Sequence, residues 1–419
     1  MRYLALSLLI SLAPIAAGCD GGEAVRLKPF ADAYAAWCQP AAGRSTSPNL
    51  AIKNLNARIS GLQRRLPLQP NNLGLRSALL GQLLQRSSAL GTFDDLDRIA
   101  ALGEEVVAIA PDDPAAHIAR AKALAARHLF TEAGAALDKA AALGARPGQL
   151  EVQRATLLEA IGNHSQSLAI MQRRLEVYPN VAGFGFVGHV LGQLGKREPA
   201  EAAFVLADRT YRDVSPFVLA DLYFRWGLMR HQAGDKPGAR QLYQAALKRL
   251  PQHAHATIHL AELSSDDEAI RLLERLTVDV DEPEALGHLA ELYQRKSDPR
   301  AAEFLSRAKQ RYTTLVARHP LAFADHAGWF WLGPGGDAER ALSAAKTNLE
   351  LRKNDEAYDL FITAAVKAGK KEMACATADR ALRAPYVRPS LREAATTAYR
   401  GCGRGVAAAA ASSASSVGI

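Results

Sequence analysis

Apolar residues recur at helical spacing along most of this chain, starting near Ile52 and separated by short stretches rich in Gly, Pro, Asn or Asp. This pattern predicts a succession of helices joined by brief turns. The second helix of each predicted pair carries a small residue, and these residues follow one another about 34 positions apart on average. They are Ala133, Ser167, Ala200, Ala239, Ala269, Ala302, Ala338 and Ala374.

A repeat of this length has a physical reason. Two antiparallel helices cannot bury their apolar faces alone, so each pair stacks on its neighbours. Helices that cross closely need Gly or Ala at the crossing point, and a proline just past the second helix prevents that helix from continuing. We therefore predict a stack of helical hairpins.

The pattern also divides the chain into segments. Residues 51-111 are predicted as degenerate N-terminal helical repeats, 112-387 as a regular solenoid, and 388-402 as a capping helix. Residues 1-18 have the layout of a signal peptide, and residues 19-50 form a tether or linker. We expect the Ala and Ser run at 403-419 to be disordered, because it has no packing residues to hold it.

The clearest copy of the repeat has an aromatic, small, small, aromatic, small and proline series. It consists of Tyr223, Gly227, Ala239, Tyr243, Ala246 and Pro251. With these residues the chain resembles the tetratricopeptide repeat (TPR) family. The resemblance implies an all-α fold, a right-handed α-solenoid of about eight to nine helix-turn-helix repeats with a C-terminal capping helix. It also implies a non-catalytic scaffold for protein-protein interaction.

In TPR proteins the first helices of the repeats line a concave groove that binds a protein or peptide partner. The resemblance therefore implies a set of groove residues in this chain, whose mixed character leaves the identity of the partner open. These residues are Asp221, Phe224, Leu228, His231, His255, Glu262, Glu291, Phe330 and Trp331. For the Trp329 to Trp331 stretch, ordinary packing between helices is an alternative.

The N-terminus carries Arg2, a short apolar stretch and then Ala16, Ala17, Gly18 and Cys19. This series resembles the lipobox of bacterial lipoprotein signal peptides, which implies lipidation at Cys19 and a membrane anchor facing the periplasm. Asp20, directly after the cysteine, resembles the signal that retains such lipoproteins at the inner membrane, and so slightly favours that membrane. Ordinary cleavage, giving a soluble periplasmic or secreted protein, is the alternative.

Composition narrows the function classes. Of 419 residues, 48% are hydrophobic and only 6% are aromatic, which favours close-packed helices over sheets. The net charge of +8 is spread along the whole length, so it indicates a mildly basic surface and no nucleic-acid footprint.

The cysteines offer one pairing. Cys375 lies near the start of one predicted helix and Cys402 at the end of the helix that returns along it. We therefore predict a disulfide between them in an oxidising compartment. Two separate thiols are the alternative, and Cys38 is left over.

The sequence contains few motifs that are typical of catalysis or of cofactor binding. Gly183, Gly185 and Gly188 match a dinucleotide fingerprint, but no strand precedes them. No nucleophile triad, carboxylate pair or phosphate loop is evident, so we predict no enzyme and no cofactor. We also predict no metal, although one helix face has ligand spacing at positions i, i+4 and i+7. That face, formed by His255, His259 and Glu262, supports an alternative function as an accessory ligand- or metal-binding component of an envelope enzyme or transport system.

Overall fold

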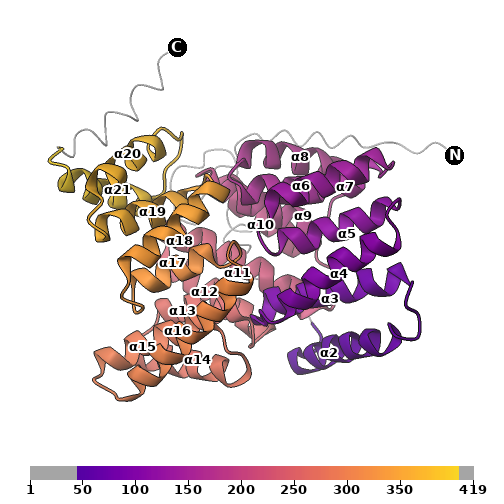
Figure 1. Cartoon of the computed structure of the whole chain (residues 1–419), viewed down its shortest axis with the longest axis horizontal. Helices are drawn as coiled ribbons and strands as arrows, with labels where there is room; N and C mark the ends of the chain where they lie inside the picture. Colours follow the sequence, from indigo (N-terminus) through magenta and orange to yellow (C-terminus); the bar gives the residue numbers. More distant parts are fainter. Residues whose placement is uncertain (1–44, 405–419) are drawn as a thin grey trace, which may run out of the picture.

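The computed structural model describes residues 45–404 and folds them into helices α2 to α21, with no β-strand among these residues. The all-α solenoid expected from the sequence is confirmed (Figure 1). The predicted signal peptide, the lipidation candidate Cys19, Cys38 and nearly all of the Ala and Ser tail lie outside the described residues.

The first nine helices cover the N-terminal half of the described chain. They are α2 (Pro48–Arg65), α3 (Leu73–Leu90), α4 (Asp95–Ile109), α5 (Pro114–Ala125), α6 (Phe130–Ala142), α7 (Pro147–Ala160), α8 (His164–Val177), α9 (Val181–Gln193) and α10 (Arg197–Thr210). The remaining helices are α11 (Pro216–Gln232), α12 (Lys236–Arg249), α13 (Ala254–Glu262), α14 (Asp266–Asp279), α15 (Pro283–Arg295), α16 (Arg300–Arg318), α17 (Ala324–Leu332), α18 (Ala338–Leu351), α19 (Asp355–Lys367), α20 (Lys371–Ala381) and α21 (Pro389–Gly401).

Helices α3 to α20 form nine consecutive hairpins, and α21 packs on the last of them. Local sequence signals set the helix starts. Proline occupies the first turn of α5, α7, α11 and α15, where its missing N–H costs no hydrogen bond. The side chains of Asn180, Asp235 and Asn354 accept hydrogen bonds from backbone N–H groups of the helices that follow them. From α5 onward, the first helices therefore begin about 34 residues apart on average.

Glycine permits the closest helix contacts inside two hairpins. A Cβ atom added at Gly188 on α9 would lie 2.9 Å from the Phe204 ring on α10. A Cβ added at Gly227 on α11 would lie 2.8 Å from the Tyr243 ring on α12. Each glycine thus lets an aromatic side chain of the second helix pack directly on the backbone of the first. The same close approach explains Gly188 without a nucleotide site.

A buried ion pair joins two neighbouring hairpins. Glu201 on α10 accepts hydrogen bonds from Nε and Nη2 of Arg230 on α11, at 2.7 and 2.9 Å, and from Trp226 Nε1 at 2.6 Å. Both charged side chains are almost completely buried. Further along the chain, a disulfide between Cys375 and Cys402, with Cα atoms 6.9 Å apart, ties α20 to the end of α21.

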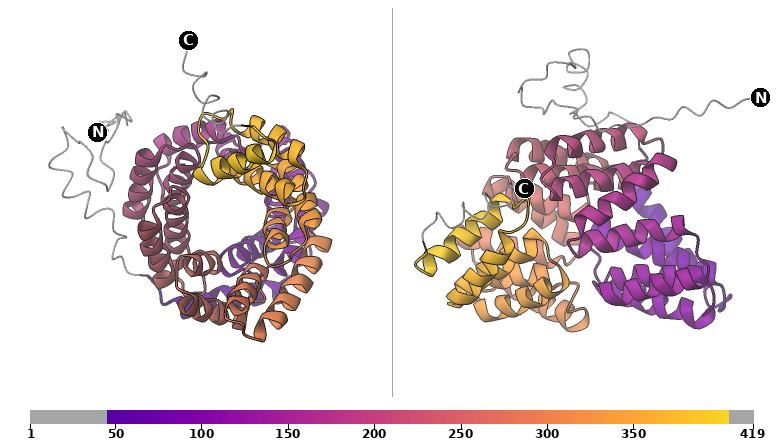
Figure 2. Two further views of the ribbon diagram at one scale, coloured as in Figure 1. Left: turned by 90° about the vertical axis from the view of Figure 1, so that its left-hand side faces the viewer. Right: turned by 90° about the horizontal axis from the view of Figure 1, so that it is seen from above.

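The solenoid coils far enough to meet itself, and Figure 2 shows the resulting ring. Phe93, just before α4, packs edge-on against Phe323, just before α17, with ring centroids 5.0 Å apart. Asp97 on α4 lies 2.9 Å from His319 Nε2. Leu315 and Phe323 belong to the same buried cluster as the N-terminal helices. We call this contact, between α4 and the segment that joins α16 to α17, the ring closure.

No helix among residues 45–404 is both long enough and apolar enough to cross a lipid bilayer.

Candidate functional site

Histidine and glutamate side chains from four first helices converge on the inside of the ring. We call this set the inner cluster: His231 on α11, His259 and Glu262 on α13, Glu284 and His288 on α15, and His326 on α17.

Short contacts connect the members of the inner cluster. His259 Nδ1 lies 2.7 Å from Glu262 Oε2, and His326 Nδ1 lies 3.1 Å from Glu284 Oε2. His288 Nε2 lies between these two pairs, 3.7 Å from Glu262 Oε1 and 4.0 Å from Glu284 Oε1. We call the first helices of the hairpins the inner helices. The cluster is continuous across three of them, α13, α15 and α17.

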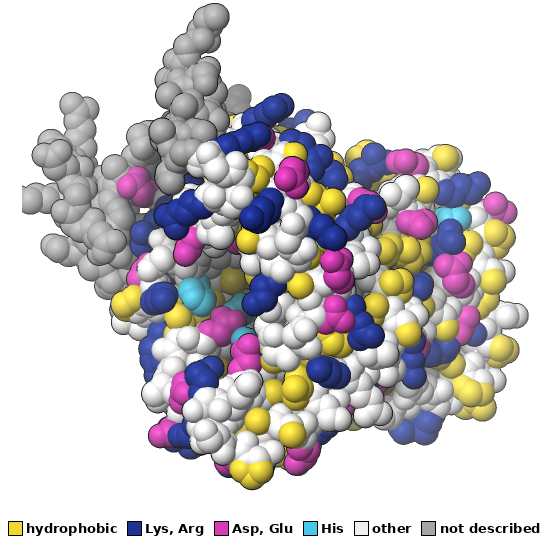
Figure 3. Space-filling view, turned by 60° about the vertical axis from the view of Figure 1, so that its left-hand side comes forward, with side chains coloured by type: hydrophobic (Ala, Val, Ile, Leu, Met, Phe, Trp, Pro, Cys, Tyr) yellow, Lys and Arg dark blue, Asp and Glu magenta, His cyan; other side chains and the backbone are white. Residues whose placement is uncertain are grey.

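A cavity of about 390 Å³ opens beside the inner cluster. Its polar wall includes His259, Glu262, Glu284 and His288, and its aromatic wall is formed by Tyr312, Trp329 and Phe330. Trp329 is 43% exposed, which is unusual for so large an apolar side chain. The space-filling view shows histidine and acidic side chains together in a hollow on one face of the molecule (Figure 3).

The contact between His326 and Glu284 sets the protonation states of these two residues. Burial disfavours the charged form of His326, but Asp325 and Glu284 outweigh it and raise the pKa of His326 to about 10. Burial likewise opposes ionisation of Glu284, yet the hydrogen bond and charge of His326 hold the pKa of Glu284 well below its usual range. At neutral pH these residues form an imidazolium-carboxylate pair.

His259 and Glu262 likewise stabilise each other's charged forms. Burial opposes the charge on His259, while the neighbouring Glu262 carboxylate raises the pKa of this histidine. Burial opposes ionisation of Glu262 too, and His259 lowers the pKa of that glutamate. Glu262 is therefore an anionic carboxylate held beside the His259 ring at neutral pH.

Further cavities lie away from the inner cluster, and two of them are compared with it. One, of about 300 Å³, includes Leu228 and Glu356 in its lining, together with His189, which is 3.0 Å from Glu159. The other, of about 510 Å³, lies between α16 and the turn from α17 to α18.

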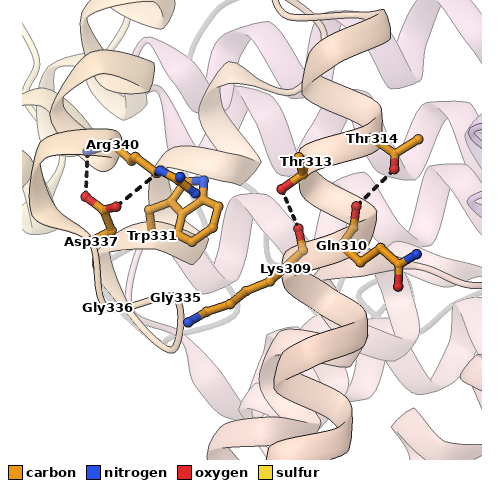
Figure 4. A pocket seen from close by; sticks show the side chains of 9 residues that line it. All are labelled: Lys309, Gln310, Thr313, Thr314, Trp331, Gly335, Gly336, Asp337 and Arg340. Atoms are coloured by element: carbon orange, nitrogen blue, oxygen red, sulfur yellow. Dashed lines mark hydrogen bonds and ion pairs between the residues drawn. The ribbon is translucent and has the colours of Figure 1, made fainter.

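Figure 4 shows the larger of these cavities. Lys309 and Thr313 of α16 lie on one side, and Trp331, Asp337 and Arg340 lie on the other. The Arg340 guanidinium lies 4.8 Å from the centre of the Trp331 ring and 3.2 Å from Asp337. Because Arg340 already pairs with Asp337 and stacks on Trp331, its charge is engaged within the protein. The inner cluster is therefore the stronger candidate for a binding site.

Most of the predicted groove residues do lie on the inner helices. His231 and Glu262 belong to the inner cluster, and Glu291 and Phe330 line the cavity beside it. Leu228 lines the cavity of about 300 Å³ that also contains His189. Asp221 forms an ion pair with Arg225 at 2.9 Å, and the Phe224 ring stacks on His255 and His259.

Trp331, a predicted groove residue, lies instead on the side of α17 that packs against its neighbours. Trp331 is buried against α16 and α18 and lines cavities on that side. Residues two positions apart on a helix point in nearly opposite directions, so Trp329 faces the inner cavity instead. Phe330 lies between them, with its ring 4.6 Å from Tyr312, and is mostly a core residue.

Of the candidate ligand face His255, His259 and Glu262, the structure groups only His259 and Glu262 with a third potential ligand. His255 lies in the first turn of the short helix α13, where its ring stacks between Phe224 and His326. His231, from the preceding inner helix, takes its place beside His259 and Glu262.

Sequence reasoning missed Glu284, His288 and His326, although a signal for two of them was present. Glu284, His288 and Glu291 repeat the i, i+4, i+7 spacing of the candidate ligand face 29 positions later. Comparing the polar faces of consecutive first helices would have placed them side by side.

No protein-family model and no curated protein matches the sequence. Among solved structures, the chain is similar to the APC/C hetero-tetramer Cut9-Hcn1, with a TM-score of 0.42 and 15% identity over 73% of this chain and 52% of that one. It is also similar to a thermophilic TPR protein in Thermus thermophilus, with a TM-score of 0.34 and 20% identity over 43% of this chain and 99% of that one. A tetratricopeptide repeat protein from Parabacteroides merdae gives a TM-score of 0.33 and 14% identity, over 68% and 98% of the two chains. At these values the partners of those proteins say nothing about the partner of this one.

Proposed function

We propose that this protein is a non-catalytic scaffold, tethered to the bacterial cell envelope on its periplasmic side, that holds a segment of a partner protein in the cavity beside the inner cluster. The observation that carries the proposal is Trp329, a large exposed aromatic side chain at a cavity whose other walls carry histidines and carboxylates. Exposed aromatic residues beside a desolvated pocket are typical anchors of protein interfaces.

The cavity favours a partner segment that presents a basic side chain. The Glu291 carboxylate lines it, and the Trp329 ring offers a face on which a cation can stack. The carboxylate of Glu291 is 3.9 Å from His288 Nδ1, too far for a strong hydrogen bond, so it can accept a better donor. The tether is supported by the lipobox-like series ending at Cys19.

Site-specific photocrosslinking tests the proposal. A photoreactive phenylalanine analogue replaces Trp329 in one strain and Leu68, an exposed side chain on the connection between α2 and α3, in another. We expect a discrete protein adduct at position 329 and none at position 68. Equal adducts at both positions, or none at 329, would contradict the proposal.

Two substitutions separate the parts of the proposal. Trp329→Ala should weaken non-covalent binding of the partner that the crosslink identifies. We expect a loss of at least about 2 kcal/mol, roughly 30-fold in affinity, because interface anchors contribute that much. Cys19→Ala should release the protein from membranes while leaving the adduct at position 329 intact. Unchanged membrane association of the Cys19 variant would contradict the lipid tether alone.

A further inference from the structure

Three potential metal ligands meet between two neighbouring inner helices. One nitrogen each from His231 and His259 and one carboxylate oxygen of Glu262 all lie within 4.8 Å of one another. We propose that His231, His259 and Glu262 bind one divalent transition-metal ion of the zinc type, with its remaining coordination position open to the cavity that contains Trp329.

The distances fit an ion after small side-chain movements. Zinc bonds to histidine nitrogen and carboxylate oxygen are about 2.0 to 2.2 Å long, which places tetrahedral ligand atoms roughly 3.4 Å apart. His259 Nδ1 and Glu262 Oε2 already lie 2.7 Å apart. The His231 and His259 rings are nearly perpendicular, at 88° with centroids 6.1 Å apart, so they do not stack face to face.

Surrounding side chains hold both imidazoles in place. The His259 ring stacks on Phe224 at 5.8 Å and on Tyr243 at 5.8 Å. His231 Nδ1 lies 3.3 Å from the hydroxyl of Tyr243, whose side chain is completely buried. A hydrogen bond from Nδ1 to that hydroxyl oxygen leaves the Nε2 lone pair of His231 free for a metal. Partners of this kind orient metal ligands and fix their tautomers.

The donor set selects the class of ion. Two imidazole nitrogens and one carboxylate oxygen suit Zn²⁺ and its neighbours, whereas Mg²⁺ and Ca²⁺ prefer sites made of oxygen alone. Glu262 is also within 4.8 Å of ligand atoms from Glu284 and His288. The charge of the Glu284 carboxylate is already balanced by His326, so the negative charge at the site comes from Glu262 itself.

The sequence alone could not identify this set, because His231 is 28 positions before His259. The inference goes beyond the proposed scaffold function and does not depend on it. The ion would be held by the protein in the absence of any partner.

Calorimetry tests the site. The full-length protein, purified with an affinity tag that contains no histidine and freed of metal with a chelator, is titrated with Zn²⁺ and separately with Mg²⁺. We expect one equivalent of Zn²⁺ to bind and no heat from Mg²⁺. His231→Asn, His259→Asn and Glu262→Gln should each weaken zinc binding by more than the roughly 10- to 100-fold that loss of an outer-shell partner costs.

His255→Asn is the matched control, since it removes an imidazole from the same helix without removing a ligand. Its zinc affinity should equal that of the unaltered protein. No zinc binding, equal binding by the three ligand variants, or an equal loss in His255→Asn would overturn the proposal. Should the histidine variants misfold, Glu262→Gln decides, because the Glu262 side chain is only partly buried and belongs to the last residue of α13.

Visible absorption of the Co²⁺ complex gives a second readout. Replacement of Zn²⁺ by Co²⁺ should give a visible absorption band of a four-coordinate site that is lost in Glu262→Gln and kept in His255→Asn. Repeating the photocrosslinking at position 329 with chelator present separates the two proposals. The partner adduct should still form without metal, because partner binding does not depend on the zinc site.

Discussion

The buried pair between Glu201 and Arg230 makes a strong prediction about stability. Glu201→Ala leaves the Arg230 guanidinium without its bidentate partner and Trp226 Nε1 without its acceptor. Breaking a buried pair in this way costs about 3 to 5 kcal/mol. Asp235, 3.7 Å from Arg230 Nη1, compensates part of the charge, so we expect the lower end of that range.

Urea unfolding followed by far-UV circular dichroism measures this cost. The control is Asp138→Ala, which breaks the pair between Asp138 and Arg154. That pair has a similar distance, 2.8 Å against 2.7 Å, but its side chains are 72% and 43% exposed against 4% and 7% for Glu201 and Arg230. Because exposed pairs contribute at most about 1 kcal/mol, the control should lose little stability.

A double variant adds a sharper test. Replacing Glu201 and Arg230 together by Met removes both charges and fills similar volume, so it should be more stable than Glu201→Ala alone. The reasoning is refuted if Glu201→Ala costs no more than Asp138→Ala, or if the double variant is less stable than Glu201→Ala.

Three further predictions concern other parts of the structure. Phe323→Ala removes the ring that packs on Phe93, which should cost about 3 to 5 kcal/mol and open the ring closure, seen as a larger radius of gyration by small-angle X-ray scattering. Burial lowers the pKa of His253 to about 4, from about 6.5 in the unfolded chain. This shift contributes about 3 kcal/mol to the free energy of unfolding above pH 6.5, and that contribution is lost as the pH falls to 4. His253→Asn, which can keep the cap on α13, should flatten this part of the pH dependence of unfolding. Reduction of the disulfide between Cys375 and Cys402, which spans 27 positions, should add the mass of two hydrogens and destabilise by about 3.5 kcal/mol in the chain-entropy model; an unchanged mass would refute the bridge.

The hairpins could be predicted from the sequence because their determinants are local. Gly227 and Tyr243 are 16 positions apart, and the contact between them is fixed within one hairpin. The inner cluster was only partly predictable, since the side of each helix that faces inward depends on how neighbouring hairpins stack. Trp329 and Trp331 show the difficulty: both are aromatic, and only the packing of α16 and α18 decides which one is buried.

The ring closure could not be predicted at all. It joins Asp97 to His319, residues more than 200 positions apart. Their meeting depends on the sum of small rotations between hairpins, none of which is encoded in a single motif.

The ring closure also changes how the chain folds. An open solenoid can nucleate at any repeat and grow one unit at a time, because each repeat touches only its neighbours. Here the apolar surface of the first repeats, around Phe93, stays uncovered until the segment containing Phe323 has been made. Such long-range contacts raise the contact order and slow the final folding step. They also couple distant repeats, so we expect the ring to melt as one cooperative unit, where an open stack would fray from its ends.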